Sequence, residues 1–265
     1  TNNVSHGFRV LSGVKNIASL TGTGETNVES GAELRANGVR QGALNIANGG
    51  KVVSRKSGSN LVRVDTLNLN SNGTLDLEDN DLIVDHGNFA TIIAKRWEGY
   101  RDAPDTSATG IISSAGQTIT GAPILAVFDN SIAGFGDWPF GSGETIGNTA
   151  VVGQFTYIGD ADLNGQVTPD DYGAIDSNLG AHVGTAEETG GMNWLAGDWN
   201  FDGDITPDDY GGVDANLGNG QTQGPQLGAA GMIAANGLAA VPEPTSLGLL
   251  GVAGLGMLSR RRRKA

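Results

Sequence analysis

The sequence predicts a mainly β fold at the N-terminus, followed by a small α domain and a C-terminal hydrophobic helix. Composition favours the β part, because Gly accounts for 43 of 265 residues and aromatic residues for only 6%. Such a chain suits short strands and tight turns better than long packed helices. Short stretches of alternating apolar and polar residues also recur along residues 1–90, and an acidic block and an apolar run mark the two later parts.

Residues 1–90 carry a loose internal repeat. The segments 27–34, 45–52 and 68–75 share a short alternating strand, a Gly or Asn turn and a second strand, at separations of 18 and 23 residues. A period near 20 residues is typical of a β-solenoid, in which each turn buries its apolar face against the next. An antiparallel sandwich would show the same alternation and stays open as an alternative. The residues expected to point inward are Leu67, Leu69, Leu75, Leu77, Leu82 and Val84.

Residues 91–158 are expected to form a β-rich cap. Residues 91–100 could form a short helix, and residues 124–128 and 150–157 are apolar enough for buried strands. The terminal turn of a solenoid needs cover for its apolar face and its unpaired strand edges. We therefore expect this region to close the open end of the solenoid.

Residues 159–218 contain two near copies of one loop, Asp160–Asp171 and Asp198–Asp209. Each copy has oxygen-bearing side chains at loop positions 1, 3, 5 and 12, Gly at position 6, and Val or Ile at position 8. This spacing is that of a twelve-residue calcium loop, in which position 7 contributes its backbone carbonyl. The alternative is a pair of metal-free Asx-rich turns. The predicted ligands of two Ca²⁺ ions are Asp160, Asp162, Asn164, Gln166 and Asp171 in the first loop, and Asp198, Asn200, Asp202, Asp204 and Asp209 in the second.

The spacing also predicts how the two loops pack. Gly165 and Gly203 lie where the chain must turn sharply, and Val167 and Ile205 are expected to pack together and tie the loops. Two short helices should follow the loops, each with one apolar face. The residues of these faces would be Tyr172, Ile175 and Leu179, and Tyr210, Val213 and Leu217.

Position 12 is Asp rather than Glu, and there is no sign of a helix before either loop. In these features, and in the Leu-Gly that ends each copy, the pair resembles type I dockerin repeats. The resemblance implies a small α domain of paired calcium loops over residues 159–218. It also implies a possible cohesin-like partner, recognised through loop positions 10 and 11. These positions hold Pro169 and Asp170 in the first loop, and Pro207 and Asp208 in the second.

The C-terminal residues 241–265 form a three-part module after a Gly-, Gln- and Ala-rich linker at 219–240. Pro242, Glu243 and Pro244 precede an apolar run at 247–258, and five cations follow. The order resembles the PEP-CTERM sorting signal. The resemblance implies an exosortase-type membrane enzyme that processes the tail during export, and transient membrane insertion through the hydrophobic helix. A simple tail anchor is the alternative, although the run is short for a stable span.

Charge and cysteine content exclude several classes of function. The net charge is −13, and residues 159–218 hold 13 acidic residues with no Lys or Arg. This acidic block argues against a nucleic-acid partner and fits a segment that holds divalent cations. The chain has no cysteine, so disulfides, thiol nucleophiles and zinc–thiolate sites are excluded.

Candidate catalytic groups are sparse. The sequence has no His-Glu-x-x-His, Gly-x-Ser-x-Gly or P-loop motif. Four acidic residues near one strand end could serve glycoside hydrolysis, although a solvated turn explains them more simply. Three aromatic residues could stack on a sugar or belong to the core and cap. The four acidic residues are Glu78, Asp79, Asp81 and Asp85, and the aromatic residues are Trp97, Tyr100 and Trp138.

The whole chain resembles exported planctomycete-type envelope proteins, which join autotransporter-like β-strand repeats, a dockerin-like module and a sorting tail. The resemblance implies export to the cell envelope, the outer surface or the extracellular matrix, with an inner-membrane intermediate and a signal peptide upstream of Thr1. The expected function is that of a non-catalytic structural protein. The alternatives are a dockerin-like adaptor for a cohesin-like partner and a carbohydrate-active β-solenoid enzyme acting on an extracellular polysaccharide.

Overall fold

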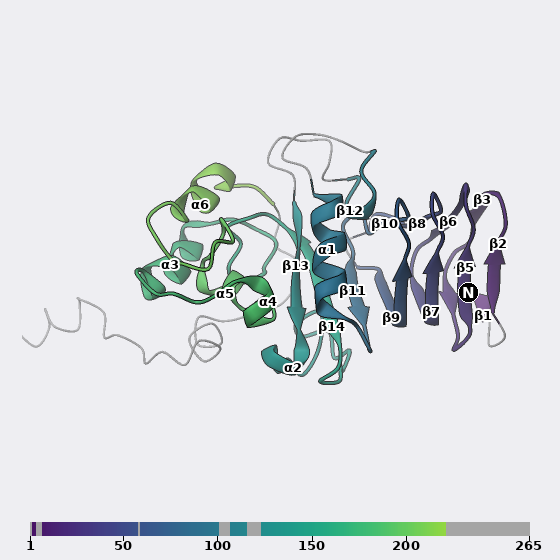
Figure 1. Ribbon diagram of the computed structural model, residues 1–265, viewed down its shortest axis with the longest axis horizontal. Coiled ribbons are helices and arrows are strands. Elements are labelled where there is room, and N and C mark those ends of the chain that lie inside the picture. Colours follow the sequence, from purple (N-terminus) through teal and green to yellow (C-terminus); the bar gives the residue numbers. More distant parts are fainter. Residues whose placement is uncertain (1, 4–6, 58, 101–106, 116–122, 221–265) are drawn as a thin grey trace, which may run out of the picture.

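A parallel β-solenoid of about four turns makes up the N-terminal part of the chain (Figure 1). The computed structural model describes residues 2–3, 7–57, 59–100, 107–115 and 123–220. One sheet has the order β1-β4-β7-β9-β11-β14-β13, with β5 pairing β2 and β7, and the second has the order β12-β10-β8-β6-β3. The solenoid strands are β1 (Asn2–Asn3), β2 (Phe8–Val10), β3 (Gly13–Asn16), β4 (Leu20–Thr21), β5 (Glu25–Val28), β6 (Ala32–Ala36), β7 (Val39–Ile46), β8 (Lys51–Ser54), β9 (Leu61–Leu69), β10 (Thr74–Asp76) and β11 (Asp81–Val84).

The strand register confirms the sequence repeat. Asn27 of β5 pairs with Asn45 of β7, and Asn45 pairs with Asn68 of β9, all in parallel. The three amides form a ladder, since Asn45 Nδ2 donates to Asn27 Oδ1 at 3.0 Å and Asn68 Nδ2 donates to Asn45 Oδ1 at 2.7 Å. Parallel pairing of successive turns requires crossover connections, so the antiparallel sandwich is excluded.

The interior of the solenoid is the first of two cores. Of the six residues predicted to point inward, Leu75, Leu77, Leu82 and Val84 are fully buried. Leu67 and Leu69 are only partly buried at the margin of this core. The reason is that β11 pairs only with residues 61–64 of β9, so the second half of β9 is not extended by a strand of the next turn.

The cap closes the solenoid by adding one helix and changing strand direction. Its elements are α1 (Phe89–Gly99), β12 (Gly110–Ile112), β13 (Ile124–Asp129), α2 (Asn130–Ala133) and β14 (Val151–Thr156). Helix α1 begins after Asn88, whose side chain accepts a hydrogen bond from the Thr91 amide at 2.9 Å. The helix and both strands expected from the sequence are confirmed. Because β14 runs antiparallel to β11, the parallel winding ends here.

A loop between α2 and β14 fastens the cap to the solenoid through Glu144. Arg40 donates two hydrogen bonds to the Glu144 carboxylate, at 2.9 and 2.8 Å, and Arg63 donates a further one. Arg63 also holds Asp85 through two hydrogen bonds of 2.9 and 2.8 Å. Hydrogen bonding by the two arginines, Arg40 first, lowers the pKa of Glu144 to about 2.

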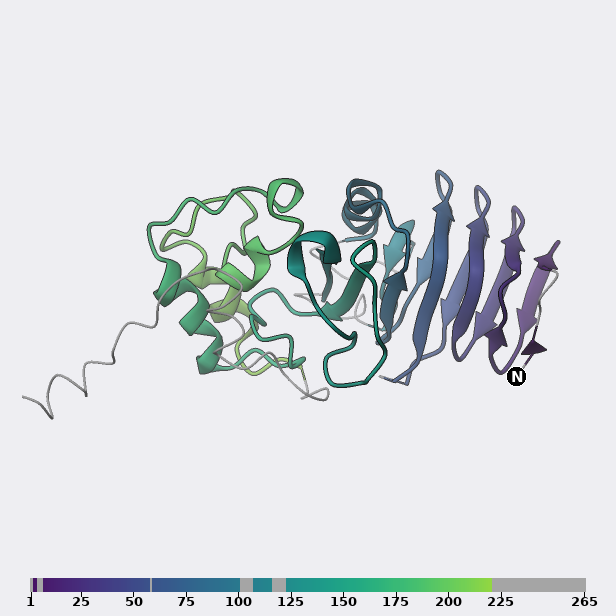
Figure 2. The same ribbon diagram turned by 90° about the horizontal axis from the view of Figure 1, so that it is seen from below.

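The paired loops pack on the outer face of the first sheet and share a second core with the cap. Ile83, Phe128 and Val152 of the sheet belong to one buried cluster with Ile175 and Val213 of the loop region. Figure 2 shows this region at the end of the molecule opposite the N-terminus. Its helices are η1 (Pro169–Asp171), α3 (Tyr172–Asn178), α4 (Ala186–Thr189), α5 (Asn193–Ala196) and α6 (Tyr210–Asn216).

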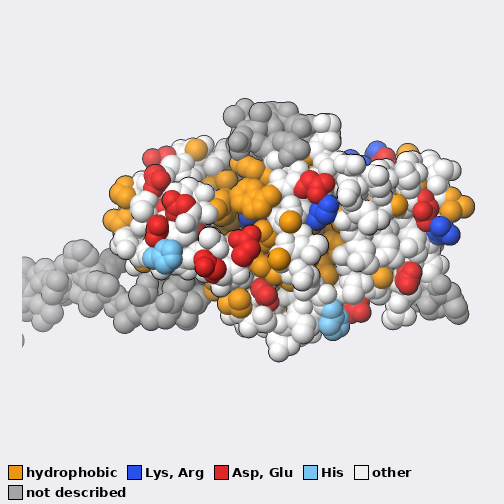
Figure 3. All heavy atoms as spheres, in the orientation of Figure 1, with side chains coloured by type: hydrophobic (Ala, Val, Ile, Leu, Met, Phe, Trp, Pro, Cys, Tyr) orange, Lys and Arg blue, Asp and Glu red, His pale blue; other side chains and the backbone are white. Residues whose placement is uncertain are grey.

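Acidic and basic side chains are distributed differently over the paired loops and over the rest of the molecule. In Figure 3 acidic side chains gather over the paired loops, whereas most Lys and Arg side chains on this face lie over the cap and solenoid. The predicted linker, apart from Asn219 and Gly220, and the predicted C-terminal helix lie outside the described residues. Within the described ranges, the helices are all too short or too polar to cross a membrane.

Candidate metal centre

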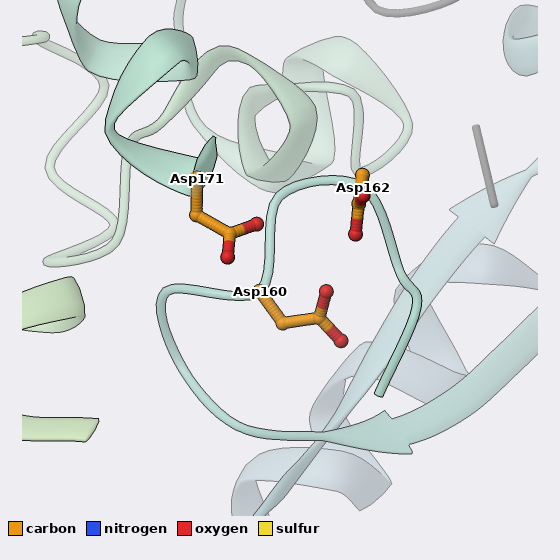
Figure 4. A group of neighbouring side chains, drawn as sticks. All are labelled: Asp160, Asp162 and Asp171. Carbon is orange, nitrogen blue, oxygen red and sulfur yellow. The ribbon is translucent and has the colours of Figure 1, made fainter. Parts of the chain in front are cut away.

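Three carboxylates converge in the first loop. Asp160, Asp162 and Asp171 each place one oxygen within 4.8 Å of the others. Figure 4 shows the three side chains turned toward a common space inside the loop. Asp160 and Asp171 are buried and Asp162 is half-buried. Three acidic groups gathered in this way repel one another unless a cation or protons lie between them.

Backbone amides hold the carboxylates of the first loop in place. The position-1 carboxylate of Asp160 accepts from the amides of Asn164 and Gly165 at 3.1 and 2.9 Å. The position-12 carboxylate of Asp171 accepts from the amides of Ala161 and Thr168, both at 2.8 Å. The loop is therefore closed around its own acidic side chains, from position 1 to position 12.

The second loop repeats this arrangement at the equivalent atoms. The Asp198 carboxylate accepts from the amides of Asp202 and Gly203, both at 3.1 Å. The Asp209 carboxylate accepts from the amides of Trp199 and Thr206, both at 2.9 Å. The near identity of the two sequences thus extends to the hydrogen bonds that shape the loops.

Both loops need a left-handed backbone at two positions. Gly165 and Gly203 have φ of 84° and 89°, as the predicted sharp turn requires. Position 4 is also left-handed, with φ of 57° at Leu163 and 63° at Phe201. Sequence reasoning missed this second bend, because Leu and Phe rarely adopt such angles and so give no signal for it.

The loops differ in the exposure of their ligand positions. In the first loop Asn164 is buried, whereas in the second both Asn200 and Asp202 are exposed. Asn200 donates to Asp202 and to Asp208, both at 3.1 Å. Among the described residues, a convergent group of three acidic side chains occurs in the first loop. The second loop also has three aspartates at its side-chain ligand positions, but Asp takes position 5 instead of position 3, and that side chain is exposed.

The two predicted carbonyl ligands also lie in these loops. Gln166 is half-buried, and Asp204 is exposed with its carboxylate 2.7 Å from Nδ1 of His182. The structure therefore places all ten predicted ligand residues in two equivalent loops, and it brings the three acidic ligands of the first loop closest together.

Each loop is tied to the end of the opposite copy. Val167 bonds through its backbone to Gly218 and Asn219, at 2.8 and 3.0 Å. The equivalent residue Ile205 bonds to residues 180 and 181, at 2.8 Å each. Val167 and Ile205 lie in one buried cluster, as expected, but these backbone bonds run crosswise between the copies. Two tyrosine hydroxyls also form hydrogen bonds between the copies, from Tyr172 to Asp214 and from Tyr210 to Asp176.

The predicted apolar helix faces are wrong at their third position. Ile175 and Val213 are buried, but Leu179 and Leu217 are 51% and 49% exposed. Helices α3 and α6 end one residue earlier, and the backbone then turns to an extended ψ. Helical periodicity therefore does not reach the two leucines.

Buried asparagines close the two helices in place of these leucines. Asn178 donates to the carbonyls of Ala174 and Ala196, at 2.8 and 3.1 Å. The equivalent Asn216 donates to the carbonyls of Gly212 and Ile158, at 3.1 and 2.9 Å. Each amide thus satisfies one carbonyl of its own helix and one from a neighbouring segment.

Residues outside the loops hold the two position-1 carboxylates. The Thr156 hydroxyl, at the end of β14, donates to Asp160, and Trp194 Nε1 donates to the Asp160 carbonyl at 2.8 Å. Asn193 Nδ2 donates to the Asp198 carboxylate at 2.9 Å. Such partners orient metal ligands and tune their affinity. Sequence reasoning missed them, although Thr156 and Asn193 precede Asp160 and Asp198 by only four and five residues, because the calcium-loop pattern begins at position 1 and assigns no role to residues before it.

Burial disfavours the ionised form of these ligands. It raises the pKa of Asp160 to about 8, with repulsion from Asp171 adding to the effect and the hydrogen bond from Thr156 opposing it. Burial also raises the pKa of Asp171 and of Asp198. A divalent cation in each loop would favour the ionised carboxylates and offset this cost.

In a chelator, the free energy of unfolding is expected to fall as the pH rises from 5 to 8. Since the pKa of Asp160 is raised on folding, the folded state binds more protons than the unfolded state across this interval. The free energy of unfolding should then fall by on the order of 1 kcal/mol per pH unit. Denaturant titrations at several pH values would measure the slope. Asp160→Asn should flatten it, and a free energy of unfolding that rises over this interval would contradict the assignment.

The other acidic candidates have separate partners. Asp85 is paired with Arg63, Asp79 accepts from the Ser57 amide at 2.7 Å, and Glu78 accepts from the Ser114 hydroxyl at 2.9 Å. Burial, with repulsion from Asp79, raises the pKa of Asp81 to about 7.

The aromatic candidates are divided between core and surface. Trp138 is fully buried in the second core. Trp97 and Tyr100 meet edge to face on the cap, with ring centroids 5.9 Å apart. The three residues therefore do not form the continuous stacking surface that the sequence left open.

Comparison with known proteins identifies the C-terminal part of the chain. Residues 240–264 match the PEP-CTERM protein-sorting motif. This match confirms the predicted sorting signal, which includes Pro242, Glu243 and Pro244. The motif implies an exported, cell-surface or envelope-associated protein that is processed by exosortase, a membrane enzyme. No curated protein and no solved structure matches the chain. The dockerin-like and autotransporter-like resemblances stay predictions.

Proposed function

We propose that the chain is a non-catalytic structural protein of the cell envelope or extracellular matrix, in which two Ca²⁺ ions hold the paired loops against the capped solenoid. The convergence of the Asp160, Asp162 and Asp171 carboxylates supports this proposal most directly. During sorting, the C-terminal hydrophobic helix would insert transiently into the inner membrane while exosortase processes the tail. This last step rests on the sorting motif at residues 240–264.

Calcium fits the chemistry of the loops better than other common metals. Ca²⁺ takes six to eight oxygen ligands in a flexible geometry, whereas Mg²⁺ demands a near-ideal octahedron and keeps several waters. Carboxylate and amide oxygens with no imidazole or thiolate among them do not suit zinc or copper. The proposed ligands are Asp160, Asp162, Asn164, Gln166 and Asp171 for one ion, and Asp198, Asn200, Asp202, Asp204 and Asp209 for the other.

The surroundings of the loops support a structural role for the ions. Asp160 and Asp198 are both completely buried. Asp160 contacts Thr156 at the end of β14, which places it at the junction with the cap, and Asp198 contacts Asn193 of α5 within the loop region. A buried carboxylate without a counter-charge destabilises a fold, so a bound cation would stabilise the junction. Calcium at such a position links the folding of the loops to the ion, as in other small metal-dependent units.

Calorimetric titration of the full chain with Ca²⁺ tests the proposal. We expect two bound ions, with Asp160→Asn removing one and Asp198→Asn removing the other, because position 1 supplies a carboxylate to each ion. Asp170→Asn is the matched control, since this exposed carboxylate lies in the first loop at position 11, which is not a predicted ligand position. The full chain is required, because the loop region shares its core with the cap. Failure to take up calcium, or a stoichiometry unaffected by both substitutions, would refute the proposal.

An adaptor for a cohesin-like partner is the second candidate. The observation in its favour is that loop positions 10 and 11 are exposed in both copies, at Pro169, Asp170, Pro207 and Asp208. A carbohydrate-active solenoid enzyme has less support, since Asp85 is paired with Arg63 and Asp79 with a backbone amide.

A further inference from the structure

The second loop meets the cap helix through an aromatic contact at loop position 4. The ring of Phe201 lies edge to face with Trp97 of α1, with centroids 5.1 Å apart and planes at 86°. The guanidinium of Arg96 lies 4.1 Å from the Trp97 ring centroid and 5.1 Å from that of Phe201. Figure 3 shows hydrophobic side chains gathered between the paired loops and the cap. Phe201 therefore joins this loop to α1.

The contact includes the buried side chain of Arg96. It continues the buried stripe of Phe89, Ile92 and Ile93 on α1 and is 3% exposed, yet its Nε and Nη2 atoms have no hydrogen-bond partner among the described residues. Burial lowers its pKa to about 10, so the side chain is still a cation at neutral pH. The charge of Glu187 on α4 opposes this lowering, and the faces of the two aromatic rings give the buried cation a further favourable contact. Loss of Phe201 from this position would leave Arg96 with one ring.

The position of Phe201 in the loop connects this contact with the proposed ion. Phe201 lies between the ligand positions Asn200 and Asp202, and its φ of 63° is one that a Phe keeps only when its neighbours hold it. An ion bound by both neighbours would hold that backbone angle and with it the direction of the ring. Without the ion, the exposed Asn200 and Asp202 side chains have only loop-internal contacts to hold them.

The first loop is attached differently at its own position 4. Leu163 is buried in the second core, and its carbonyl accepts from Gln154 Nε2 on β14 at 3.1 Å. Trp97, in contrast, is 39% exposed, so the contact of the second loop lies at the surface. The first loop is thus attached through buried contacts, and the second through a contact at the edge of the shared core, where Phe201 also packs on Trp194.

We propose that calcium in the second loop locks the paired-loop region onto α1 through Phe201, with Trp97 and Arg96 as the receiving side chains. The calcium dependence rests on the proposed function, whereas the aromatic contact is a feature of the structure itself. The ion would thereby stiffen the junction between the loops and the solenoid. A protein outside the cell would be rigid at this junction where calcium is abundant and looser where it is scarce.

Hydrogen–deuterium exchange of α1 in the full chain tests this inference. Saturation with Ca²⁺ should slow exchange from peptides covering residues 89–99 by about tenfold, the protection expected from one aromatic and one cation–π contact. Phe201→Asn should remove this effect while calorimetry still detects two ions, because Asn adopts the left-handed region readily and keeps the loop backbone. Leu217→Asn, at an exposed site on α6's C-terminal side, should leave the effect intact. Trp97→Leu repeats the test from the α1 side.

The outcomes separate the two ideas. If calorimetry shows both ions bound but exchange from α1 is unchanged, the lock is refuted and the proposed function stands. If exchange slows equally in wild type, Phe201→Asn and Trp97→Leu, the contact is not the route and the inference also fails. If no calcium binds, the proposed function fails, and the calcium-dependent lock fails with it.

Discussion

Chelation of calcium is expected to lower the midpoint of thermal unfolding of the full chain by about 10 °C or more. An ion that binds only the folded state stabilises it by about 2.7 kcal/mol when its free concentration is a hundred times its Kd. Two such sites double this value, and each kcal/mol corresponds to about 2–4 °C in a chain of this size. Differential scanning calorimetry in calcium and in chelator would measure the difference.

Because the loops and the cap share one core, the loss of stability on chelation should be detectable by tryptophan fluorescence as well as by calorimetry. Trp138 of the cap and Trp194 and Trp199 of the loop region belong to one buried cluster, so tryptophan emission should report the same destabilisation as calorimetry. Magnesium at equal concentration is the control and should restore little of the midpoint. The double variant Asp160→Asn/Asp198→Asn should be insensitive to calcium. An unchanged midpoint in strong chelator would show that the loops do not depend on the ion.

Gly191→Ala is expected to destabilise the protein by about 3–5 kcal/mol, through left-handed strain and a steric clash together. Gly191 has φ of 88°, and a Cβ at this position would lie 1.9 Å from the carbonyl oxygen of Val127 on β13. The chain cannot easily move away, since the Asp129 amide donates to the Gly190 carbonyl at 2.9 Å. Denaturant unfolding of the variant would measure the effect.

Gly180→Ala is the matched control for this substitution. Gly180 also lies in the paired-loop region and has φ of 84°, but no atom lies within 4 Å of its added Cβ. Its cost should be limited to left-handed strain, about 1–2 kcal/mol. Similar losses in the two variants would mean that the loop region does not pack tightly against β13.

The solenoid could be predicted because its information is local and repeated. The offsets that align Asn27 with Asn45 and Asn68 are those of the strand register. Each turn of the solenoid must bury one apolar face against the next turn, so apolar residues recur at equivalent positions along the sequence. The partial exposure of Leu67 and Leu69 could not be predicted in this way, since it depends on how far the next strand extends.

Part of the candidate site could be predicted for the same reason. Ligand spacing is a property of one twelve-residue loop, and the copy at Asp198–Asp209 supports the interpretation of the first at Asp160–Asp171. The prediction of the apolar helix faces was wrong at Leu179 and Leu217. The point at which a helix ends depends on the hydrogen-bond donors that its last carbonyls can find. Buried Asn178 and Asn216 provide those bonds, and a polar residue on a helix gives no sequence sign of burial.

The sequence by itself determined the repeat of the N-terminal strands, the spacing of the two acidic loops and the sorting motif, because each depends on residues close together in the chain. Only the tertiary structure decided that the loops share a core with the cap, that Thr156 and Asn193 hold the first carboxylate of each loop, and that Phe201 rests on Arg96 and Trp97. The core and aromatic contacts join residues far apart in sequence, whereas Thr156 and Asn193 precede their aspartates by only four and five residues, outside the loop pattern. Their partners are selected by shape and desolvation at the junction, and no periodic pattern records that choice.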